Sequence, residues 1–419
     1  MSAFFKFIYI SIGSLLFSYL VFSQQPVQDA KKQEQKLIIF DINDLILIKQ
    51  KIYSEVQEYK KAYQQLIDEA NELLNVRPYS VMDKTETPAS GDKHDYYSIG
   101  TYWWPDSTKG NGLPYIRKDG ITNPKVSSDA FDKSRRSKTI HAIETLSIAY
   151  YYSENETYAK KAVDFIKTWF INPATRMNPN INFGQAIPGI NNGRDVGVID
   201  FSILPACLDH IELLKESKYW QPKDQQKLKD WLSEFLDWFL TSRIALAESR
   251  KPNNHGTYYD FQVAYMSLYL GKTETTQGIL EGAQRRIDWQ IKNDGSQPEE
   301  LIRTRSYEYS IVNLRALMLL ARIGEKAGTD LWHYQSPQNG SIIKAFDFII
   351  DYITKLEQWP GLQIETIRFS DKLFDLLVIT HKAFPDKGYD NIIESFPKNE
   401  IVQNPYFLKE TLNYMKTQL

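Results

Sequence analysis

The sequence has very few of the residues that build disulfides and transition-metal sites. It holds one cysteine, Cys207, and six histidines among 419 residues. A single cysteine can neither close an intramolecular disulfide nor complete a zinc cage, and no two histidines have the spacing of helical metal ligands. The composition therefore argues against a zinc centre, while scattered carboxylates leave a calcium site open.

Nucleotide-binding and nucleic-acid-binding signals are missing as well. The chain contains no Walker loop, no Rossmann glycine pattern and no nucleophile elbow. Its formal net charge is -2, so the surface offers no basic field for nucleic acid. Any site for a polyanion must therefore be a local patch.

Aromatic residues are abundant, with 26 Tyr, 9 Trp and 21 Phe. Aromatic rings bury large areas and so account for much of a core. Flat aromatic faces also line carbohydrate clefts, so the excess is consistent with a sugar-binding protein.

The first 23 residues have the pattern of a signal peptide. Lys6 precedes an apolar run from Phe7 to Phe22, and Gln24 follows the expected cleavage point. We expect a mature chain of residues 24–419 that is periplasmic or secreted and not inserted in the membrane. A single uncleaved anchor is the alternative. No cysteine stands near the cleavage point, which argues against a lipoprotein.

Helical periodicity dominates the rest of the chain. One apolar stripe runs from Leu45 to Leu73 in steps of three and four. Further helical patterns cover residues 128–153, 155–170, 197–216, 223–248, 257–270, 273–292, 306–327, 340–356, 370–384 and 401–417. So many short helices joined by short loops predict an all-α fold, a single α/α toroid in the form of an incomplete barrel of helical hairpins. Residues 76–127 lack periodicity and form a long aromatic-rich loop region.

A turn at Pro252–Asp260 is the first candidate for chemistry. It reads Pro-Asn-Asn-His-Gly-Thr-Tyr-Tyr-Asp and leads into a helix. Asn253 or Asn254 would simply cap that helix. Alternatively, the amide of Asn254 and the imidazole of His255 would grip an anion at the helix N-terminus.

The second candidate is the segment Asp294–Tyr309. An unbroken helix would place Arg303 and Tyr309 on different faces, so they converge only if a helix begins between them. Ser306 is the expected N-cap, which puts Tyr309 in the first turn, where the helix dipole favours a phenolate. Tyr307 is the competing tyrosine. The bland interpretation is a turn followed by a helix with solvated arginines and core tyrosines.

Two further segments complete the set. Residues 185–197 form a glycine-rich loop with one arginine, Arg194, and residues 95–106 carry Tyr-Trp-Trp-Pro-Asp at Tyr102–Asp106. Each has a plain structural interpretation, as a connector and as an aromatic plug over the edge of the core. Trp103 and Trp104 would otherwise form a platform for sugar rings.

The four segments together resemble the alginate lyase domain family. The resemblance rests on Tyr-Trp-Trp-Pro-Asp, Gln-Ala-Ile-Pro-Gly, Asn-Asn-His-Gly-Thr and Asp-Gly-Ser-Gln-Pro…Arg-Thr-Arg-Ser-x-x-Tyr-Ser, in this order, over about residues 90–335. It implies an α/α toroid and metal-independent β-elimination on a 1,4-linked uronate polymer, alginate first and glucuronan as the alternative. It also implies no cofactor and an anionic polysaccharide as the partner.

The resemblance assigns roles to particular residues. Asn254, His255 and Arg303 would neutralise the uronate carboxylate, and Tyr309, its pKa lowered by nearby arginines, would be base, acid or both. His255 would be the base where the C5 proton lies on the opposite face. From the same segments we expect substrate contacts from Tyr102, Trp103, Trp104, Gln185, Arg194, Tyr258, Gln297 and Arg305.

Two rival functions stay open on the sequence. A glycoside hydrolase on the same fold would need two carboxylates flanking the bond, and four are available: Asp200, Asp260, Glu299 and Glu308. A non-catalytic polysaccharide-binding protein would keep the aromatics without the His–Tyr–Arg cluster.

Overall fold

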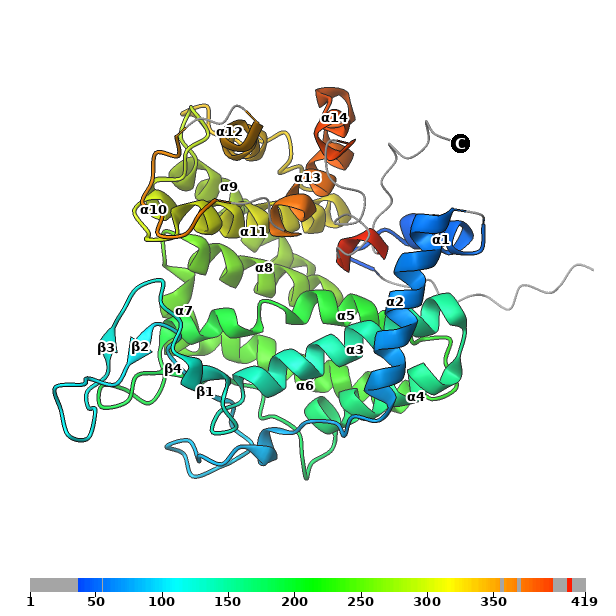
Figure 1. The fold of residues 1–419 in the computed structure, drawn as a ribbon, viewed down its shortest axis with the longest axis vertical. Coiled ribbons are helices and arrows are strands. Elements are labelled where there is room, and N and C mark those ends of the chain that lie inside the picture. Colours follow the sequence, from blue (N-terminus) through cyan, green and yellow to red (C-terminus); the bar gives the residue numbers. More distant parts are fainter. Residues whose placement is uncertain (1–36, 55, 355–357, 368–370, 395–404, 409–419) are drawn as a thin grey trace, which may run out of the picture. The chain divides into compact units, whose positions relative to one another are not determined.

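The computed structural model describes residues 37–54, 56–354, 358–367, 371–394 and 405–408 (Figure 1). All of them belong to one compact unit. The signal-peptide expectation concerns residues that lie outside this part of the chain. No helix among the described residues is long and apolar enough to cross a membrane.

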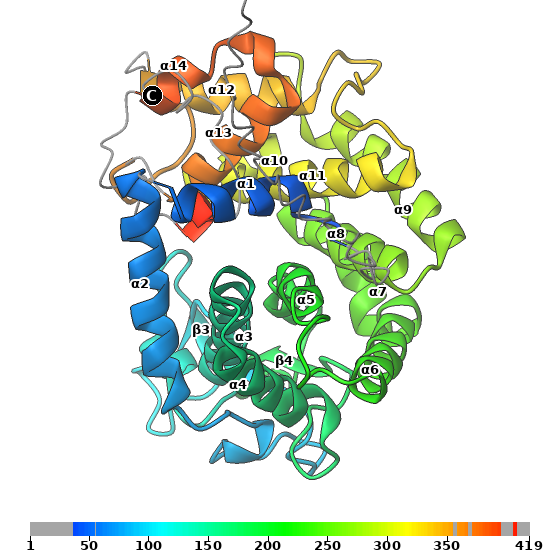
Figure 2. The same cartoon turned by 90° about the vertical axis from the view of Figure 1, so that its right-hand side faces the viewer.

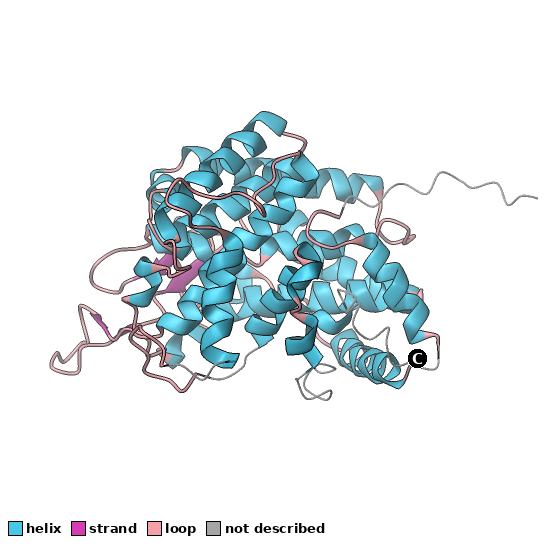
Figure 3. Cartoon of the chain, turned by 90° about the horizontal axis from the view of Figure 1, so that it is seen from above, coloured by secondary structure: helices cyan, strands magenta, loops and turns pink. Residues whose placement is uncertain are grey.

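Helices make up most of the described structure (Figure 3). They are α1 (Ile42–Ile52), α2 (Gln57–Leu74), α3 (Lys133–Ser153), α4 (Glu156–Ile166), α5 (Leu204–Glu212), α6 (Pro222–Thr241), α7 (Arg243–Ser249), α8 (Asn254–Tyr269), α9 (Thr273–Gln290), α10 (Pro298–Leu301), α11 (Ser306–Ala327), α12 (Ile342–Thr354), α13 (Asp371–Ala383) and α14 (Asp390–Glu394). Gly271 follows α8, and Gly328 follows α11. Both have the left-handed backbone conformation, which glycine adopts without steric cost.

The helices form two layers (Figure 2). Along the inner layer, α3, α5, α8, α11 and α13 contact one another in succession. The outer layer, α2, α4, α6, α9 and α12, packs against these inner helices. The sequence already separates the layers, because α8 and α11 are buried on nearly every side while α2 buries a single stripe. The expected all-α toroid is confirmed.

Several expected boundaries were wrong. The stripe at residues 45–73 is two helices, since α1 ends at Ile52 and α2 begins at Gln57. The pattern at 197–216 divides into a 3-10 helix, Asp195–Phe201 (η4), and α5, and the pattern at 223–248 divides into α6 and α7. Periodicity continues through such breaks because both pieces bury the same face. The expected helix at 401–417 lies largely outside the described residues.

Two small sheets organise the aromatic-rich region. β1 (Tyr97–Ile99) pairs in parallel with β4 (Phe183–Ala186), and β2 (Trp103–Trp104) pairs antiparallel with β3 (Ile116–Arg117). β4 contacts η4, and η4 contacts α7, which leads to α8. The sheets therefore lie at the end of the unit where α8 begins (Figure 1).

A buried strap, residues 37–40, joins distant helices. The backbone N–H groups of Ile38, Ile39 and Phe40 all donate to the carboxylate of Asp209 on α5. Arg322 on α11 donates to the carbonyl of Ile39 at 2.8 Å. The strap thus connects α5 to α11 through its own backbone.

Candidate active site

The turn before α8 presents Asn254 and His255. Asn253 is the N-cap, and its side chain accepts a hydrogen bond from the backbone N–H of His255 at 3.3 Å. The capping interpretation is therefore correct for Asn253, whereas Asn254 is the first residue of the helix. Asn254 and His255 consequently stand on the N-terminal turn of a helix, where the dipole is positive.

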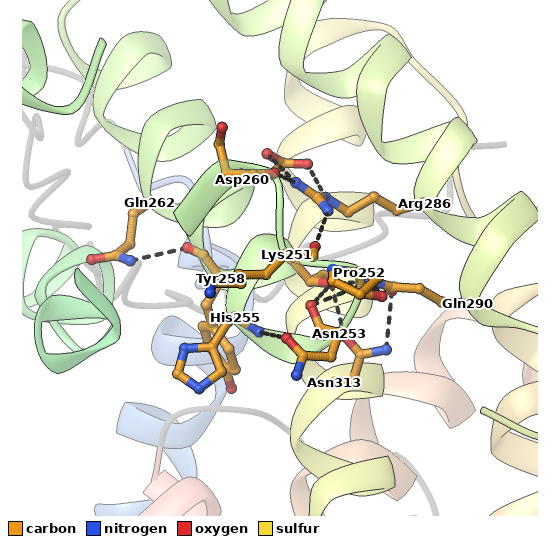
Figure 4. A network of polar contacts seen from close by, with 12 residues as sticks. Lys251, Pro252, Asn253, His255, Tyr258, Asp260, Gln262, Arg286, Gln290 and Asn313 are labelled. Carbon is orange, nitrogen blue, oxygen red and sulfur yellow. Dashed lines mark hydrogen bonds and ion pairs between the residues drawn. The ribbon is translucent and has the colours of Figure 1, made fainter. Parts of the chain in front are cut away.

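Buried polar side chains of α9 form hydrogen bonds with the backbone of this turn (Figure 4). Arg286 donates to the carbonyls of Ser249 and Lys251 at 2.7 and 3.0 Å, and it forms a buried ion pair with Asp260. Gln290 donates to the carbonyl of Pro252 at 2.9 Å. In Figure 4 the ring of His255 points away from the Asp260–Arg286 pair. Arg286 and Gln290 therefore fix the backbone of the turn without contacting the His255 imidazole.

Glu248, at the end of α7, orients the imidazole. Nδ1 of His255 lies 2.5 Å from Oε1 of Glu248, which is fully buried. Burial raises the pKa of the Glu248 carboxyl, while the contact with His255 lowers it. With Nδ1 engaged, Nε2 is the ring nitrogen on the opposite side, and it is the one left to meet a substrate.

Glu300, on α10, holds Asn254. Its carboxylate accepts the backbone N–H of Asn254 at 2.6 Å and the side-chain Nδ2 at 2.9 Å. Burial raises the pKa of Glu300 to about 7, against the lowering effects of Asn254, Arg303 and His255. Glu300, which holds Asn254, therefore also interacts electrostatically with Arg303 and His255.

The expected helix start between Arg303 and Tyr309 is confirmed. α10 ends at Leu301 and α11 begins at Ser306, so Tyr309 lies in the first turn of α11. The guanidinium carbon of Arg303 lies 3.8 Å from the centre of the Tyr309 ring. The expected N-cap was wrong by one residue, because Arg305 is the N-cap and makes no capping hydrogen bond through its side chain.

Tyr309 and Tyr307 occupy different surroundings. Tyr307 is 1% exposed and packs edge-on against Trp359. Tyr309 is half-buried, with its hydroxyl 3.0 Å from that of Tyr102. Residues two apart on a helix lie about 200° apart, so only one of them can face Arg303. The geometry therefore favours Tyr309 as the reactive tyrosine.

The pKa of Tyr309 departs from the expectation. Burial raises the pKa of the Tyr309 hydroxyl well above the usual tyrosine value, and its contact with Tyr102 raises it further. Arg303 acts in the expected direction and lowers the pKa, but it does not outweigh burial. The expectation of a lowered pKa was therefore wrong, and Tyr309 is a neutral phenol before substrate binds.

Asp119, just after β3, connects the aromatic-rich region to this cluster. Its carboxylate accepts from Arg303 Nη2 at 3.2 Å, from the Thr304 hydroxyl at 2.9 Å and from Arg117 at 2.6 Å. The Nε–H of Arg303 is buried without a hydrogen-bond partner among the described residues. The Arg303 side chain as a whole is 15% exposed, so a carboxylate ligand would meet the guanidinium through its exposed part.

Residues 185 and 194, expected to contact substrate, are fixed to each other. Arg194 donates to the backbone and side-chain oxygens of Gln185 at 2.9 and 3.2 Å. The Gln185 amide also donates to buried Asp200 at 2.9 Å. The guanidinium carbon of Arg194 lies 5.8 Å from the centre of the Trp103 ring. Arg194 thus shares a surface with Trp103, while the Gln185 amide serves internal bonds.

The other expected contacts are distributed unevenly. Trp103 and Trp104 are half-buried, and the Trp104 indole donates to the carbonyl of Ile121. Tyr258 is 7% exposed, and Gln297 is 1% exposed with its amide hydrogen-bonded to α11. Arg305 pairs with Glu365 at 2.7 Å. Sugar binding by these residues stays a prediction, and the burial of Gln297 favours a structural role for it.

Three of the four carboxylates that a hydrolase would use are engaged with other side chains. Asp260 is paired with Arg286, and Asp200 accepts from Ser98 and Gln185 in the interior. The Glu308 carboxylate accepts from Gln363, and Glu299 is exposed. The engagement of three of the four with other side chains argues against a pair that flanks one glycosidic bond.

The sequence did not single out three acids that organise the site, Glu248, Glu300 and Asp119. Glu300 stands inside the Asp294–Tyr309 segment, three residues before Arg303, which was the one available signal. No group of three or more His, Cys, Asp or Glu side chains in the described part of the chain is arranged to hold a metal ion.

Comparison with known proteins supports one family. The family model for alginate lyase matches residues 80–359, and no curated protein matches the chain. The crystal structure of an alginate lyase from Bacteroides ovatus is 36% identical, with a TM-score of 0.84, over 90% of this chain and 99% of that one. Alginate lyase A1-III from Sphingomonas species A1 is 14% identical, with a TM-score of 0.49, over 77% of this chain and 88% of that one. The chain belongs to the alginate lyase family of polysaccharide lyases.

Proposed function

We propose that the protein cleaves alginate by β-elimination without a metal ion, leaving an unsaturated uronate at the new non-reducing end. The observation that carries this proposal is the meeting of Arg303 and Tyr309 beside the α8 turn, linked through Glu300. Family membership and the similarity to the Bacteroides ovatus enzyme support alginate as the polymer. Glucuronan is the alternative substrate.

The first chemical requirement is to neutralise the uronate carboxylate. The C5 proton is weakly acidic while that carboxylate is charged, and the enediolate that forms on its removal places more charge there. A preorganised donor at such an oxyanion contributes about 3 kcal/mol. Asn254, on the first turn of α8, and the guanidinium of Arg303, on the loop before α11, supply such donors.

The second requirement is an acid for the leaving O4. Tyr309 is a neutral phenol, since burial raises its pKa, and so it carries the proton that the leaving oxygen needs. Where the C5 proton lies on the same face, Tyr309 first gives its own proton to solvent, and the phenolate, stabilised by Arg303, then takes the C5 proton and passes it to O4. Where it lies on the opposite face, Nε2 of His255 removes it, with Glu248 holding the ring.

Substitution of Tyr309 tests the assignment. Tyr309→Phe should lower turnover by about a thousandfold and leave oligomer binding largely intact. The assay follows the ultraviolet absorbance of the unsaturated product from polymannuronate, polyguluronate and glucuronan. Tyr307→Phe is the matched control, because Tyr307 packs against Trp359 in the core. Near-normal product release by Tyr309→Phe would contradict the role of Tyr309.

The same assay separates the rival functions. A glycoside hydrolase would release reducing ends without ultraviolet absorbance, and a binding protein would bind polymer without any product. We also propose, on the pattern of residues 1–23 alone, that the chain is exported to the periplasm or beyond. The mass of the mature protein tests that proposal.

A further inference from the structure

Glu300 is a buried acid whose two oxygens both contact Asn254. It is 1% exposed, and it lies on the four-residue helix α10. Oε1 accepts the backbone N–H of Asn254, and Oε2 accepts from Nδ2 of the Asn254 side chain. The backbone of α10 is fixed by hydrogen bonds from Glu300 N–H to Gln297 and from Arg303 N–H to Glu300. The carboxyl group is thus held against the Asn254 amide, which is itself 1% exposed and is the group proposed to bind the substrate carboxylate.

An ionised Glu300 conflicts with the task of Asn254. Arg303, on the loop after α10, and His255, at the start of α8, both lower the pKa of Glu300, and the Glu248 carboxylate lies against His255. A substrate carboxylate entering beside Asn254 would add a second negative charge to this group. Two carboxylates that share one site repel each other, and the cheaper state is the one in which one of them is protonated.

We propose that Glu300 is a positioning residue whose proton sets the direction of the Asn254 side-chain amide, and that the neutral form is the one that admits a uronate carboxylate. The inference rests on the proposed function of Asn254. It adds a residue that acts through Asn254 and does not touch the substrate.

The two states differ by one proton on Oε2. In the ionised state Oε2 accepts from Nδ2, so Asn254 offers a ligand one N–H and its own oxygen. In the neutral state Oε2–H donates to Oδ1 of Asn254, the amide is turned over, and both N–H groups face away from Glu300. Oε1 accepts the backbone N–H of Asn254 in both states. Two hydrogen bonds therefore join Glu300 to Asn254 in both states, and only the neutral state offers a ligand two donors.

The pKa of Glu300, raised to about 7 by burial, places this change close to neutral pH. A bound uronate carboxylate disfavours the ionised form further. By linkage, substrate binding above this pH must take up a proton, and kcat/KM must fall as the free enzyme loses it.

Glu300→Gln tests the inference directly. Glutamine can accept the backbone N–H and donate to Oδ1 of Asn254, so it copies the neutral state at every pH. In the native enzyme kcat/KM should fall about tenfold per pH unit above the pKa of Glu300. The glutamine variant should lack this decline and match the native enzyme within about threefold below it. Glu299→Gln, at the exposed neighbouring position, should keep the native profile.

A purely structural role for Glu300 gives a different result. Glu300→Gln would then lower activity by the same factor at every pH, and the decline would remain, which would overturn the proposal. If the Glu300→Gln variant forms product and its kcat/KM still falls with rising pH, the positioning role of Glu300 is excluded and the proposed lyase activity stands. If no uronate polymer yields product, the proposed function has failed first.

Calorimetry gives a second measurement that needs no Glu300 variant. A uronate tetrasaccharide binding to the Tyr309→Phe protein, in two buffers of different ionisation enthalpy, reports the protons exchanged. We expect uptake approaching one proton above the pKa of Glu300 and little uptake one to two units below it, on the order of a single titrating group. Equal uptake at both pH values would overturn the proposal.

Discussion

The α8 turn, residues 251–257, and the hairpin segment, residues 102–119, contribute to the same site by different means. The turn is held by Arg286 and Gln290 through buried bonds to backbone carbonyls. The hairpin segment is largely exposed and reaches α11 and the loop before it through Tyr102 and Asp119. The groups proposed for catalysis thus stand on a buried frame, while the expected sugar-binding rings stand on an exposed extension.

The largest expected effect comes from removing the frame. Arg286→Met deletes the bonds to Ser249 and Lys251 and leaves Asp260 buried without its cation. Breaking a buried pair on one side costs about 3–5 kcal/mol, so the free energy of unfolding, measured with urea, should fall by that amount. Lys272→Met removes an ion pair with Asp237 at the surface and should cost less than about 1 kcal/mol. If the two variants lose equal free energy of unfolding, the buried bonds of Arg286 stabilise the protein no more than a surface ion pair does.

An intermediate effect is expected where the hairpin segment meets the cluster. Asp119→Asn weakens the contacts to Arg303 and Arg117, which are charged, by about 1.5–3 kcal/mol. We expect kcat to fall about tenfold to a hundredfold while unfolding changes little, because the carboxylate is near the surface. Asp106→Asn, on the same segment, is the control, because the Asp106 carboxylate accepts its hydrogen bonds from Thr108 and not from the Arg303 cluster. An unchanged kcat would show that Arg303 holds its place without Asp119.

The smallest effect should come from the indole rings. Trp103→Ala and Trp104→Ala should each raise KM about threefold to tenfold, or about 1 kcal/mol for one aromatic contact, and leave kcat nearly constant. Steady-state kinetics on alginate measure this. Trp289→Ala, exposed on α9, should change neither constant. If both hairpin variants keep the native KM, the two rings only pack the segment.

Local signals in the sequence predicted the frame of the site better than its electrostatics. The break before Ser306 and the cap at Asn253 follow from residues within a few positions of each other, so they could be predicted. Glu300 could not be identified, because its partner Asn254 lies 46 residues away and depends on which helices meet. The raised pKa of Tyr309 could not be predicted for the same reason, because burial depends on distant parts of the chain. The helix dipole is a local effect, whereas burial is set by the packing of the whole unit.

The strap at residues 37–40 bears on how the chain acquires its structure. Its partners lie 171 residues away at Asp209 and 283 residues away at Arg322. Contacts between residues so distant along the chain form late in folding, because the chain must lose the entropy of closing a long loop before the contact can stabilise it. Until α11 has been synthesised, the carbonyl of Ile39 lacks its hydrogen bond from Arg322. The N-terminal segment of a nascent chain therefore cannot reach its final packing before α11 is made. Proteolysis during refolding should therefore find this segment cleavable after the inner helices have become resistant.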